Sequence, residues 1–367
     1  MKFLQIAALL GSWLGVGTAI LAQAPVEVTP KLVNAKIETR AVIGALAAEL
    51  RSIVARQAAP EWIGYAVAQV AGERTMCCGD YSEGSRWNCG TCRLEGRENG
   101  TNMRTEEDKK VKLEGPRNVL VLFRAEKSAV GKIRVISEEC ELDAGGLTVV
   151  WLTSVKPAES VTLLETFALE GYKESREERR MGDAALMAIA LQEGQAADRA
   201  LTSFTAPDKP EKLREQTAFW LGATRGAAGM PLLVKMAESD PSPDVRGQVA
   251  FGLSVSKGPG AVEEMIRMAK SDESGHVRGQ ALFWLAQKAG NKATGAISAA
   301  IEDDPDTDVK KKAVFALSQL PKDEGVPRLI EVARTNRNRE VRKQAMFWLG
   351  QSEDPRALKF FEEILLN

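Results

Sequence analysis

The side chains that could carry out chemistry are concentrated in one stretch of the sequence. All five cysteines of the 367-residue chain fall there: Cys77, Cys78, Cys89, Cys92 and Cys140. The spacing of Cys89 and Cys92 is that of a redox motif or of half a zinc site. The sequence has a single histidine, His276, so a Ser-His-Asp or Cys-His apparatus would have to be built around that residue.

Three chemistries fit the cysteines, and the residues by themselves leave all three open. Disulfide bonds among the five would staple the polar stretch of residues 79–110, as an oxidising compartment favours. A zinc site could use Cys77, Cys78, Cys89 and Cys92, although an adjacent pair is not the usual ligand spacing. Thiol redox chemistry at Cys89 and Cys92 lacks the flanking strand and helix that would activate a thiolate. Disulfides are the favoured interpretation, and neither a cofactor nor a metal is predicted.

The start of the chain predicts export. Lys2 precedes an apolar run from Phe3 to Leu21, and small residues follow at Ala22 and Ala24. This pattern is typical of a secretory signal peptide over residues 1–22. An uncleaved membrane anchor is the alternative, because the run is near the ~20 residues that span a bilayer. We expect a secreted or periplasmic protein with no membrane insertion after signal cleavage.

Residues 25–172 are predicted to form a small α+β domain that positions the cysteines. A helix is expected over residues 38–57, followed by a strand over residues 62–70. Residues 119–123 and 132–136 predict a hairpin, and residues 147–152 a third strand. The expected apolar face of the first helix is formed by Ile43, Leu46, Leu50, Ile53 and Val54. A second helix is expected from Pro157 to about residue 169.

The C-terminal half contains five units with a constant period of 32 residues. When the units are aligned, residues at the same position form a column, and the apolar column is Leu213, Val245, Val277, Val309 and Val341. A basic column follows one residue later, at Arg214, Arg246, Arg278, Lys310 and Arg342. A phenylalanine column follows six residues later, at Phe219, Phe251, Phe283, Phe315 and Phe347. Repeats of this period are stacked supersecondary units.

Each unit is predicted to contain two helices. The expected capping residues of the first helices are Asp244, His276, Asp308 and Glu340. Turn residues, among them 258–260 and 321–325, are expected to separate the two helices. Residues 181–212 keep the apolar spacing at Ala185, Ile189, Leu201 and Phe204 without the other columns, which is expected of a terminal unit.

The pattern Asp-Val-Arg, two spacers, Ala and then Leu-Gly or Leu-Ala resembles the HEAT repeat of the short, phycobilisome-lyase-like type. The resemblance covers about residues 181–367 and implies a right-handed α-solenoid whose concave face is lined by second helices. Most such proteins are binding scaffolds, although some are chromophore lyases or di-iron hydroxylases that use His-Glu pairs. This sequence has no His-Glu dipeptide. The predicted fold class is therefore mixed, with an α+β domain followed by an all-α HEAT-like solenoid.

Two columns have alternative interpretations. The basic column could bind anions, but pairing with acidic residues of the loops between units is favoured. The phenylalanine column could pack between neighbouring first helices, or it could be a partly exposed stripe that docks a partner. Polar residues of the second helices mix both signs, which suits protein recognition; the candidates are Lys235, Arg267 and Arg328.

Composition narrows the choice of partner. Lys and Arg number 49 against 50 Asp and Glu, for a formal charge of −1, which argues against nucleic acid. We therefore predict an exported scaffold that binds a protein or peptide without catalysis. The alternatives are a metal- or thiol-dependent or lyase-like enzyme, and a structural component of the envelope.

Overall fold

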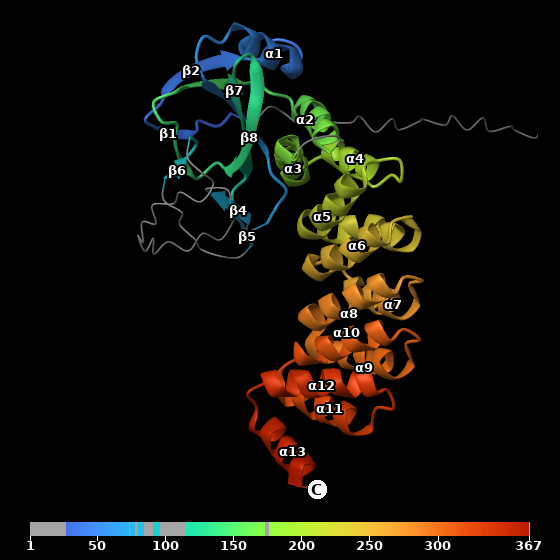
Figure 1. Ribbon diagram of the computed structural model, residues 1–367. Helices are drawn as coiled ribbons and strands as arrows, with labels where there is room; N and C mark the ends of the chain where they lie inside the picture. Colours follow the sequence, from blue (N-terminus) through green and yellow to red (C-terminus); the bar gives the residue numbers. More distant parts are fainter. Residues whose placement is uncertain are drawn as a thin grey trace, which may run out of the picture.

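The computed structural model describes residues 27–72, 74–77, 80–83, 91–95, 115–172 and 176–366. The predicted signal peptide, Cys78 and Cys89 lie outside these residues. Figure 1 shows two parts, a region of β-sheet followed by a long column of helices that ends at α13 (Pro355–Leu366). The predicted combination of an α+β region and an all-α solenoid is confirmed.

A five-stranded mixed sheet forms the framework of the first part, in the order β2-β10-β3-β7-β8. Its members are β2 (Lys36–Ala41), β10 (Thr148–Thr153), β3 (Glu61–Ala68), β7 (Asn118–Glu126) and β8 (Ala129–Ser137). β2, β10 and β3 run parallel, and β3, β7 and β8 run antiparallel. The predicted hairpin, third strand and strand near residue 62 are therefore confirmed.

Two smaller sheets accompany the large one. The first has the order β1-β9-β6, from β1 (Lys31–Val33), β9 (Glu141–Asp143) and β6 (Cys92–Arg93). The second pairs β4 (Arg74–Cys77) with β5 (Asp80–Glu83). Cys92 therefore lies on the strand that pairs with β9, and Cys140 immediately precedes β9.

The predicted helix over residues 38–57 is wrong in its first third. β2 occupies residues 36–41 and pairs with β10, and only α1 (Leu46–Arg56) is helical. Ile43, placed on the predicted apolar face, is 94% exposed. Gly44 ends the extended segment with a φ of +114°, a conformation that favours glycine. A partner strand remote in sequence thus took residues whose local pattern suited a helix.

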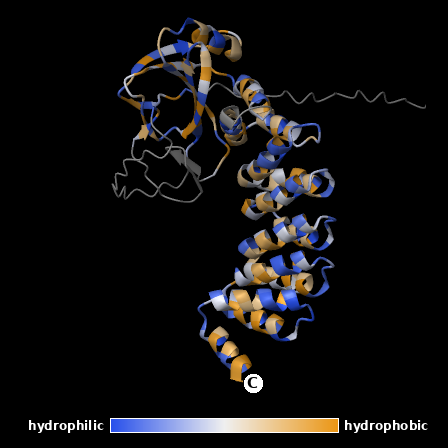
Figure 2. Ribbon diagram, viewed as in Figure 1, coloured by the Kyte–Doolittle hydropathy of each residue, from blue (hydrophilic) through white to orange (hydrophobic). Residues whose placement is uncertain are grey.

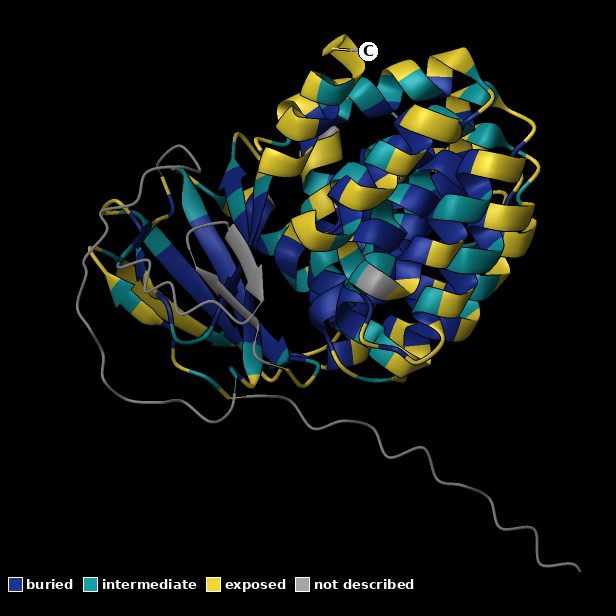
Figure 3. Cartoon of the chain, turned by 90° about the horizontal axis from the view of Figure 1, so that it is seen from below, coloured by how far each residue is buried: buried dark blue, intermediate teal, exposed yellow. Residues whose placement is uncertain are grey.

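The two faces of the large sheet bury different sets of side chains. One face packs against α1 and α2 (Pro157–Gly171), with Tyr65, Val121 and Phe123 among its buried residues. The other buries Trp62 and Trp151 with Leu94 and Cys92 of the cysteine-bearing stretch. Figure 3 shows buried residues along the strands and between the helices, with exposed residues outside. The predicted helix from Pro157 is confirmed.

The second part is a stack of helical hairpins in two layers. After α3 (Arg176–Leu191) and α4 (Gln195–Phe204), the helices are α5 (Glu211–Ser239), α6 (Pro243–Val255), α7 (Ala261–Ser271), α8 (Gly275–Ala289), α9 (Thr294–Asp303), α10 (Thr307–Ser318), α11 (Lys322–Thr335), α12 (Arg339–Gln351) and α13. The first helices α6, α8, α10 and α12 contact one another in turn and form one layer. The second helices α7, α9, α11 and α13 form the other layer (Figure 1). In Figure 2, apolar and polar residues alternate within every helix of the stack, as expected when each helix buries one side.

Glycines create the turns inside two units. α5 contains both helices of the first unit, which meet at Gly226 with φ 48° and ψ −122°. Gly290 adopts nearly the same conformation in the third unit and begins a short 3₁₀ turn, η1 (Gly290–Ala293). Both glycines have positive φ, which a side chain would oppose.

The first helices begin two residues earlier than predicted. Ser242, Asp306 and Asn338 are the capping residues, and their side chains accept hydrogen bonds from backbone N–H groups. The predicted caps Asp244, His276, Asp308 and Glu340 lie inside the first turn instead. Acidic residues are favourable at that position because of the helix dipole, which explains why the pattern resembled a cap. The predicted turn at residues 321–325 is also wrong, because α11 begins at Lys322.

The basic column holds successive units together. Arg246 Nε and Nη2 donate to the two carboxylate oxygens of Asp272 at 2.9 and 3.0 Å. Arg246 Nη1 donates to the carbonyl of Asp240, in the loop before its helix, at 2.9 Å. Equivalent buried pairs join Arg214 to Asp240 and Arg278 to Asp304. The predicted pairing with loop acids is confirmed for these three units, and the anion-binding interpretation is wrong for them.

The last two units replace the buried carboxylate pair with contacts to the backbone. Lys310 Nζ donates to the carbonyl of Glu302, and Arg342 Nη1 donates to the carbonyl of Asn336. Asn336 stands in the sequence where the other units have Asp240, Asp272 and Asp304.

The sheet and the helical stack share one core. Val70 N–H donates to the carbonyl of Leu191 at 2.8 Å, and Glu193 N–H donates to that of Ala68 at 3.1 Å. α3 packs against α2 and against β8. The apolar residues predicted for the atypical terminal unit are all buried: Ala185, Ile189, Leu201 and Phe204. Among the described residues, no helix has both the length and the apolar character needed to cross a membrane.

We expect Gly222→Ala to lower stability by more than about 2 kcal/mol, because a Cβ at this position would lie 1.9 Å from the carbonyl oxygen of Gly252 in the next first helix. Gly295→Ala on α9 is the matched control, since nothing lies within 4 Å of its Cβ position. The control should be neutral or up to ~1 kcal/mol more stable. Urea unfolding measures both, and equal effects of the two substitutions would contradict direct stacking of the first helices.

Arg278→Met should lower the free energy of unfolding at pH 7 by about 3 kcal/mol, because it leaves the carboxylate of Asp304 buried without its partner. The control is Lys311→Met, which removes the exposed pair with Asp308 and should cost less than about 1 kcal/mol.

The same pair predicts a pH dependence. Burial, the largest single cause, would raise the pKa of Asp304, but the hydrogen bonds from Arg278 and the Asp306 backbone and the charges of Arg278 and Lys310 together lower it. A carboxyl group whose pKa is lowered on folding stabilises the fold at pH values above its unfolded-state pKa of ~3.9. This stabilisation is lost as the pH falls below that value. The stability difference between wild type and Arg278→Met should therefore shrink between about pH 5 and pH 3. A difference that stays constant over this range would contradict this role of the pair.

Candidate binding surface

The predicted phenylalanine column lies along the layer of first helices. Phe219, Phe251, Phe283 and Phe315 are half-buried, and Phe347 on α12 is 55% exposed. Neither of the two predicted interpretations excludes the other. The rings contact neighbouring helices and also keep part of their surface in solvent.

Phenylalanine and tryptophan rings form a continuous series along this layer, which we call the aromatic ladder. In spatial order its members are Trp220, Phe219, Phe251, Trp284, Phe283, Phe315, Trp348 and Phe347. Contacts between units join Phe219 to Phe251 at a centroid distance of 5.2 Å and Phe283 to Phe315 at 5.7 Å, both stacked. Both centroid distances lie within the range that favours paired aromatic rings.

Tryptophans complete the ladder, a role that was not predicted from the sequence. The ring centroid of Trp284 lies 4.4 Å from that of Phe251 and 4.8 Å from that of Phe283. Trp348 contacts Phe315 and Phe347 in the same way. The sequence did contain a signal. Phe-Trp dipeptides begin at Phe219, Phe283 and Phe347, while the units between them place Gly252 or Ala316 after phenylalanine. Large and small residues thus alternate from unit to unit, as interdigitated packing requires.

Amide side chains accompany the ladder on the same helices. Three positions before each phenylalanine the chain has Gln216, Gln248, Gln280, Lys312 and Gln344. Four positions after the last three phenylalanines the chain has Gln287, Gln319 and Gln351, whose side chains are exposed. Gln287 Nε2 donates to Gln319 Oε1 at 3.3 Å, so amides of neighbouring units touch. Aromatic faces beside amides can hold apolar groups and hydrogen-bond a polypeptide backbone.

The predicted polar candidates lie in the other layer. Lys235 is on the second half of α5, Arg267 on α7 and Arg328 on α11, all second helices. Arg267 donates to both carboxylate oxygens of Glu264, and this pairing raises the pKa of its guanidinium. Arg328 lines a cavity of about 580 Å³ with Thr294, Asp323 and Glu331. The structure therefore does not bring these three residues together with the phenylalanine column.

Basic residues also link the units at the ends of the first helices, an arrangement that was not predicted from the sequence. Lys288 Nζ donates to the carbonyls of Ser254 and Ser256 at 2.9 and 2.7 Å, and burial lowers its pKa. Arg225 donates to the carbonyls of Ala190 and Gln192 at 2.6 and 2.8 Å. Carbonyls that the helix itself leaves unbonded are satisfied in this way by the following unit.

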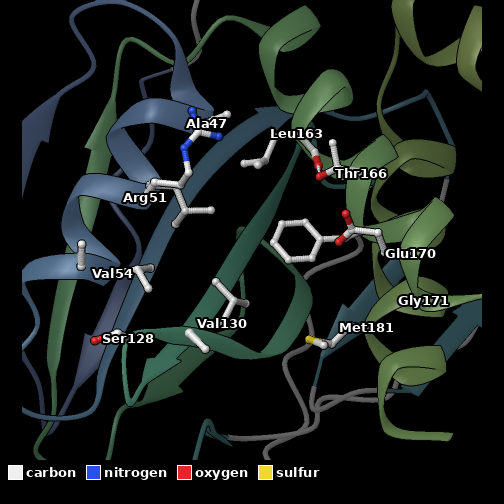
Figure 4. Close-up of a pocket in the computed structure, with 14 residues that line it drawn as sticks. Ala47, Arg51, Val54, Ser128, Val130, Leu163, Thr166, Glu170, Gly171 and Met181 are labelled. Carbon is white, nitrogen blue, oxygen red and sulfur yellow. Dashed lines mark hydrogen bonds between the residues drawn. The ribbon is translucent and has the colours of Figure 1, made fainter. Parts of the chain in front are cut away.

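A cavity of about 1060 Å³ lies between α1, α2, the start of α3 and the turn from β7 to β8. Its apolar lining includes Leu50, Val54 and Phe167. Figure 4 shows Arg51 and Glu170 on opposite sides of this lining. Ser128 and Thr166 add two hydroxyl groups to the lining. The volume and lining suit an organic molecule.

The cysteines are only partly described. Cys92 and Cys140 are buried, and Cys140 is disulfide-bonded. Within the described ranges, no three His, Cys, Asp or Glu side chains are grouped as a metal site requires. The zinc alternative includes Cys78 and Cys89, which lie outside those ranges, so the cysteine pairing and the zinc site stay predictions.

The comparisons with known proteins concern the helical stack. Residues 199–286 and 295–367 match the family model of HEAT repeats, which confirms the resemblance for this part of the chain. The phycobilisome-lyase-like subtype stays a prediction. No curated protein matches the chain.

Several solved structures are similar to about half of this chain. Human deoxyhypusine hydroxylase in complex with glycerol is 17% identical, with a TM-score of 0.31, over 56% of this chain and 90% of that one. A designed armadillo repeat protein in complex with the peptide (KR)4 is 18% identical, with a TM-score of 0.29, over 52% of this chain and 99% of that one. The karyopherin Kap121p bound to the SUMO protease Ulp1p is 13% identical, with a TM-score of 0.36, over 57% of this chain and 26% of that one. Likenesses at this level say nothing about function.

Substitutions along the ladder should distinguish rings that are packed in the stack from rings that lie mostly on its surface. We expect Phe251→Ser to lower stability by about 2 to 3 kcal/mol, since its ring packs between Phe219 and Trp284. Phe347→Ser should cost less than about 1 kcal/mol, because its ring is mostly exposed. Chemical unfolding measures both, and an equal large loss for Phe347→Ser would mean that the exposed end of the ladder serves only packing.

Proposed function

We propose that this protein, in which residues 199–367 form HEAT repeats, is an exported scaffold that binds a protein or peptide partner through the aromatic ladder and has no catalytic activity of its own. The observation that carries the proposal is a continuous row of rings that is half-buried from Phe219 to Trp348 and most exposed at Phe347. Aromatic side chains are enriched at protein interfaces because they bury much area at little entropic cost.

The geometry of the ladder favours an elongated partner. Its rings repeat once or twice per helical hairpin, so a partner that follows the stack meets the same chemistry in each unit. The amide groups of Gln287 and Gln319 lie in register beside the rings and can bond to an extended backbone. The mixed charges of the chain, with a formal sum of −1, do not favour a polyanion.

Two observations support export. The first residues have the pattern of a signal peptide, with Lys2 before an apolar run. Cys140 is disulfide-bonded, and such bonds persist mainly in oxidising compartments.

The test is selection of binding peptides from a random display library on the immobilised full-length mature protein. We expect Phe347→Ser to weaken binding of the selected peptides at least tenfold, which corresponds to about 1.4 kcal/mol. The matched control is Ile43→Ser, which removes an apolar side chain that is 94% exposed and far from the ladder in sequence. The control should bind within about twofold of wild type, since scattered surface substitutions have small effects. Equal binding by wild type and Phe347→Ser would refute a docking role for the ladder.

A further inference from the structure

The large sheet ends in a strand whose outer edge is open. β2 is the first strand in the order β2-β10-β3-β7-β8 and pairs only with β10 among the described strands, whereas β8 at the opposite edge packs against α3. Figure 1 shows β2 at the outer margin of the sheet region, away from the column of helices. All residues of β2 are exposed except Arg40, which is half-buried. An open edge of this kind can pair with another strand.

Every second residue of β2 directs its backbone groups outward. The backbone N–H groups of Lys36 and Val42 point toward β10, since they donate to carbonyls on that side at 3.2 and 3.0 Å. The backbone groups of successive strand residues point in opposite directions, so those of Ile37, Thr39 and Ala41 point away from β10. No described residue is hydrogen-bonded to these outward groups. The edge of β2 therefore offers the N–H and C=O groups of three residues to a partner strand.

Charges of opposite sign alternate along the same edge. Lys36, Glu38 and Arg40 lie on the face of the sheet that carries α1, where Arg40 Nη1 donates to Glu49 at 3.0 Å. The other donors of this guanidinium stay available. Burial is the main cause that raises the pKa of Glu61 on β3; the charge of Glu38 adds to this effect and that of Arg40 opposes it. Glu38 thus has a like charge near it in its own chain, and it forms no ion pair with a described residue.

An antiparallel copy of β2 matches this pattern. When a two-fold axis passes through Thr39, Glu38 lies opposite Arg40 of the second copy, and Arg40 lies opposite Glu38 of that copy. Ile37 lies opposite Ala41 in the same way, so each outward N–H meets an outward C=O. Opposite charges and paired threonines directly across an antiparallel ladder are both favourable. The charged pairs occupy the positions without shared hydrogen bonds, where side chains come closest.

The charges also select this register. Moving the axis to Glu38 would place two glutamates opposite each other, and moving it to Arg40 would place two arginines there. Like charges directly opposite each other are destabilising. An axis at Ile37 would pair Lys36 with Glu38 but would leave the second half of β2 without a partner strand. Only the axis at Thr39 combines opposite charges with pairing along the whole strand.

We infer that β2 is a dimerisation edge, on which a second copy of this chain pairs its own β2 antiparallel with Thr39 on the two-fold axis. The pairing joins the two large sheets into one and uses the same surface on both copies, so it closes at two. One strand edge buries little area, and the expected Kd is therefore on the order of 10 µM. This edge is independent of the aromatic ladder, which lies on the first helices of the stack.

The test is sedimentation equilibrium of the full mature protein from about 1 to 300 µM at ~0.1 M salt, where close charge pairs are only partly screened. We expect a reversible equilibrium between monomer and dimer with no larger species, because a two-fold pairing is closed. A protein that stays monomeric over this range, or one that grows without limit, would overturn the proposal.

Two charge variants decide the register. Glu38→Lys and Arg40→Glu should each weaken dimerisation at least tenfold, since each places like charges opposite one another on both sides of the axis. An equimolar mixture of the two variants should dimerise again, because each pair across the axis then has opposite charges. A dimer that persists in either variant alone contradicts the pairing of Glu38 with Arg40, and so does a mixture that stays monomeric.

Two further variants test the backbone and the specificity of the charge change. Thr39→Pro removes an N–H that points away from β10, which an edge strand tolerates, and should abolish the dimer while the monomer stays folded. Glu362→Lys makes the same charge change at an exposed position of α13 and should dimerise within about twofold of wild type. Loss of the dimer in Glu362→Lys would place the contact elsewhere and overturn the proposal. Should Arg40→Glu not fold, Glu38→Lys and Thr39→Pro decide, since a dimer retained by either one overturns it.

Discussion

Three arginines at the start of first helices, Arg214, Arg246 and Arg278, each bind two successive loops of the stack. Arg246 binds the carboxylate of Asp272 at the end of its own unit and the carbonyl of Asp240 at the end of the unit before. Arg278 repeats the arrangement with Asp304 and Asp272. Because the guanidinium is planar and its bonds are directional, the contact fixes the rotation of one hairpin on the next as well as their distance. The burial of the charges makes the contact dependent on both partners.

The aromatic ladder depends on that constant geometry. Rings can stack from Phe219 to Phe251 and from Phe283 to Phe315 only if consecutive first helices are in the same register. Close approach of the backbones contributes too, since Gly222 and Gly252 leave no room for a side chain between α5 and α6. A surface with one chemical pattern per unit is thus a product of the packing, and it is this surface that the proposed partner would follow.

The sheet region and the helical stack are held together by direct contacts as well as by the chain that connects them. Backbone hydrogen bonds connect the end of β3 to the end of α3, and α2 and α3 pack on each other beside the sheet. The first unit of the stack therefore has a neighbour on both sides, which a terminal repeat needs if its apolar side is to be covered.

The sequence by itself determined the elements whose patterns are local and repeated. The period of 32 residues, the basic column and the phenylalanine column all follow from side chains that recur in the same environment, so their spacing can be read along the chain. The strands over residues 119–123 and 132–136 were equally clear, because a hairpin joins neighbours in sequence. The loop acids that pair with Arg214, Arg246 and Arg278 were expected for the same reason.

Only the tertiary structure decided the features that depend on partners distant in sequence. Residues 38–41 became strand because β10, more than a hundred residues later, pairs with them. The half-exposure of the phenylalanines and the bridging role of Trp284 and Trp348 depend on how closely adjacent units pack, and no single unit contains that distance. The burial of Arg134 is of the same kind, since it follows from the assembled sheet and not from any stretch of residues.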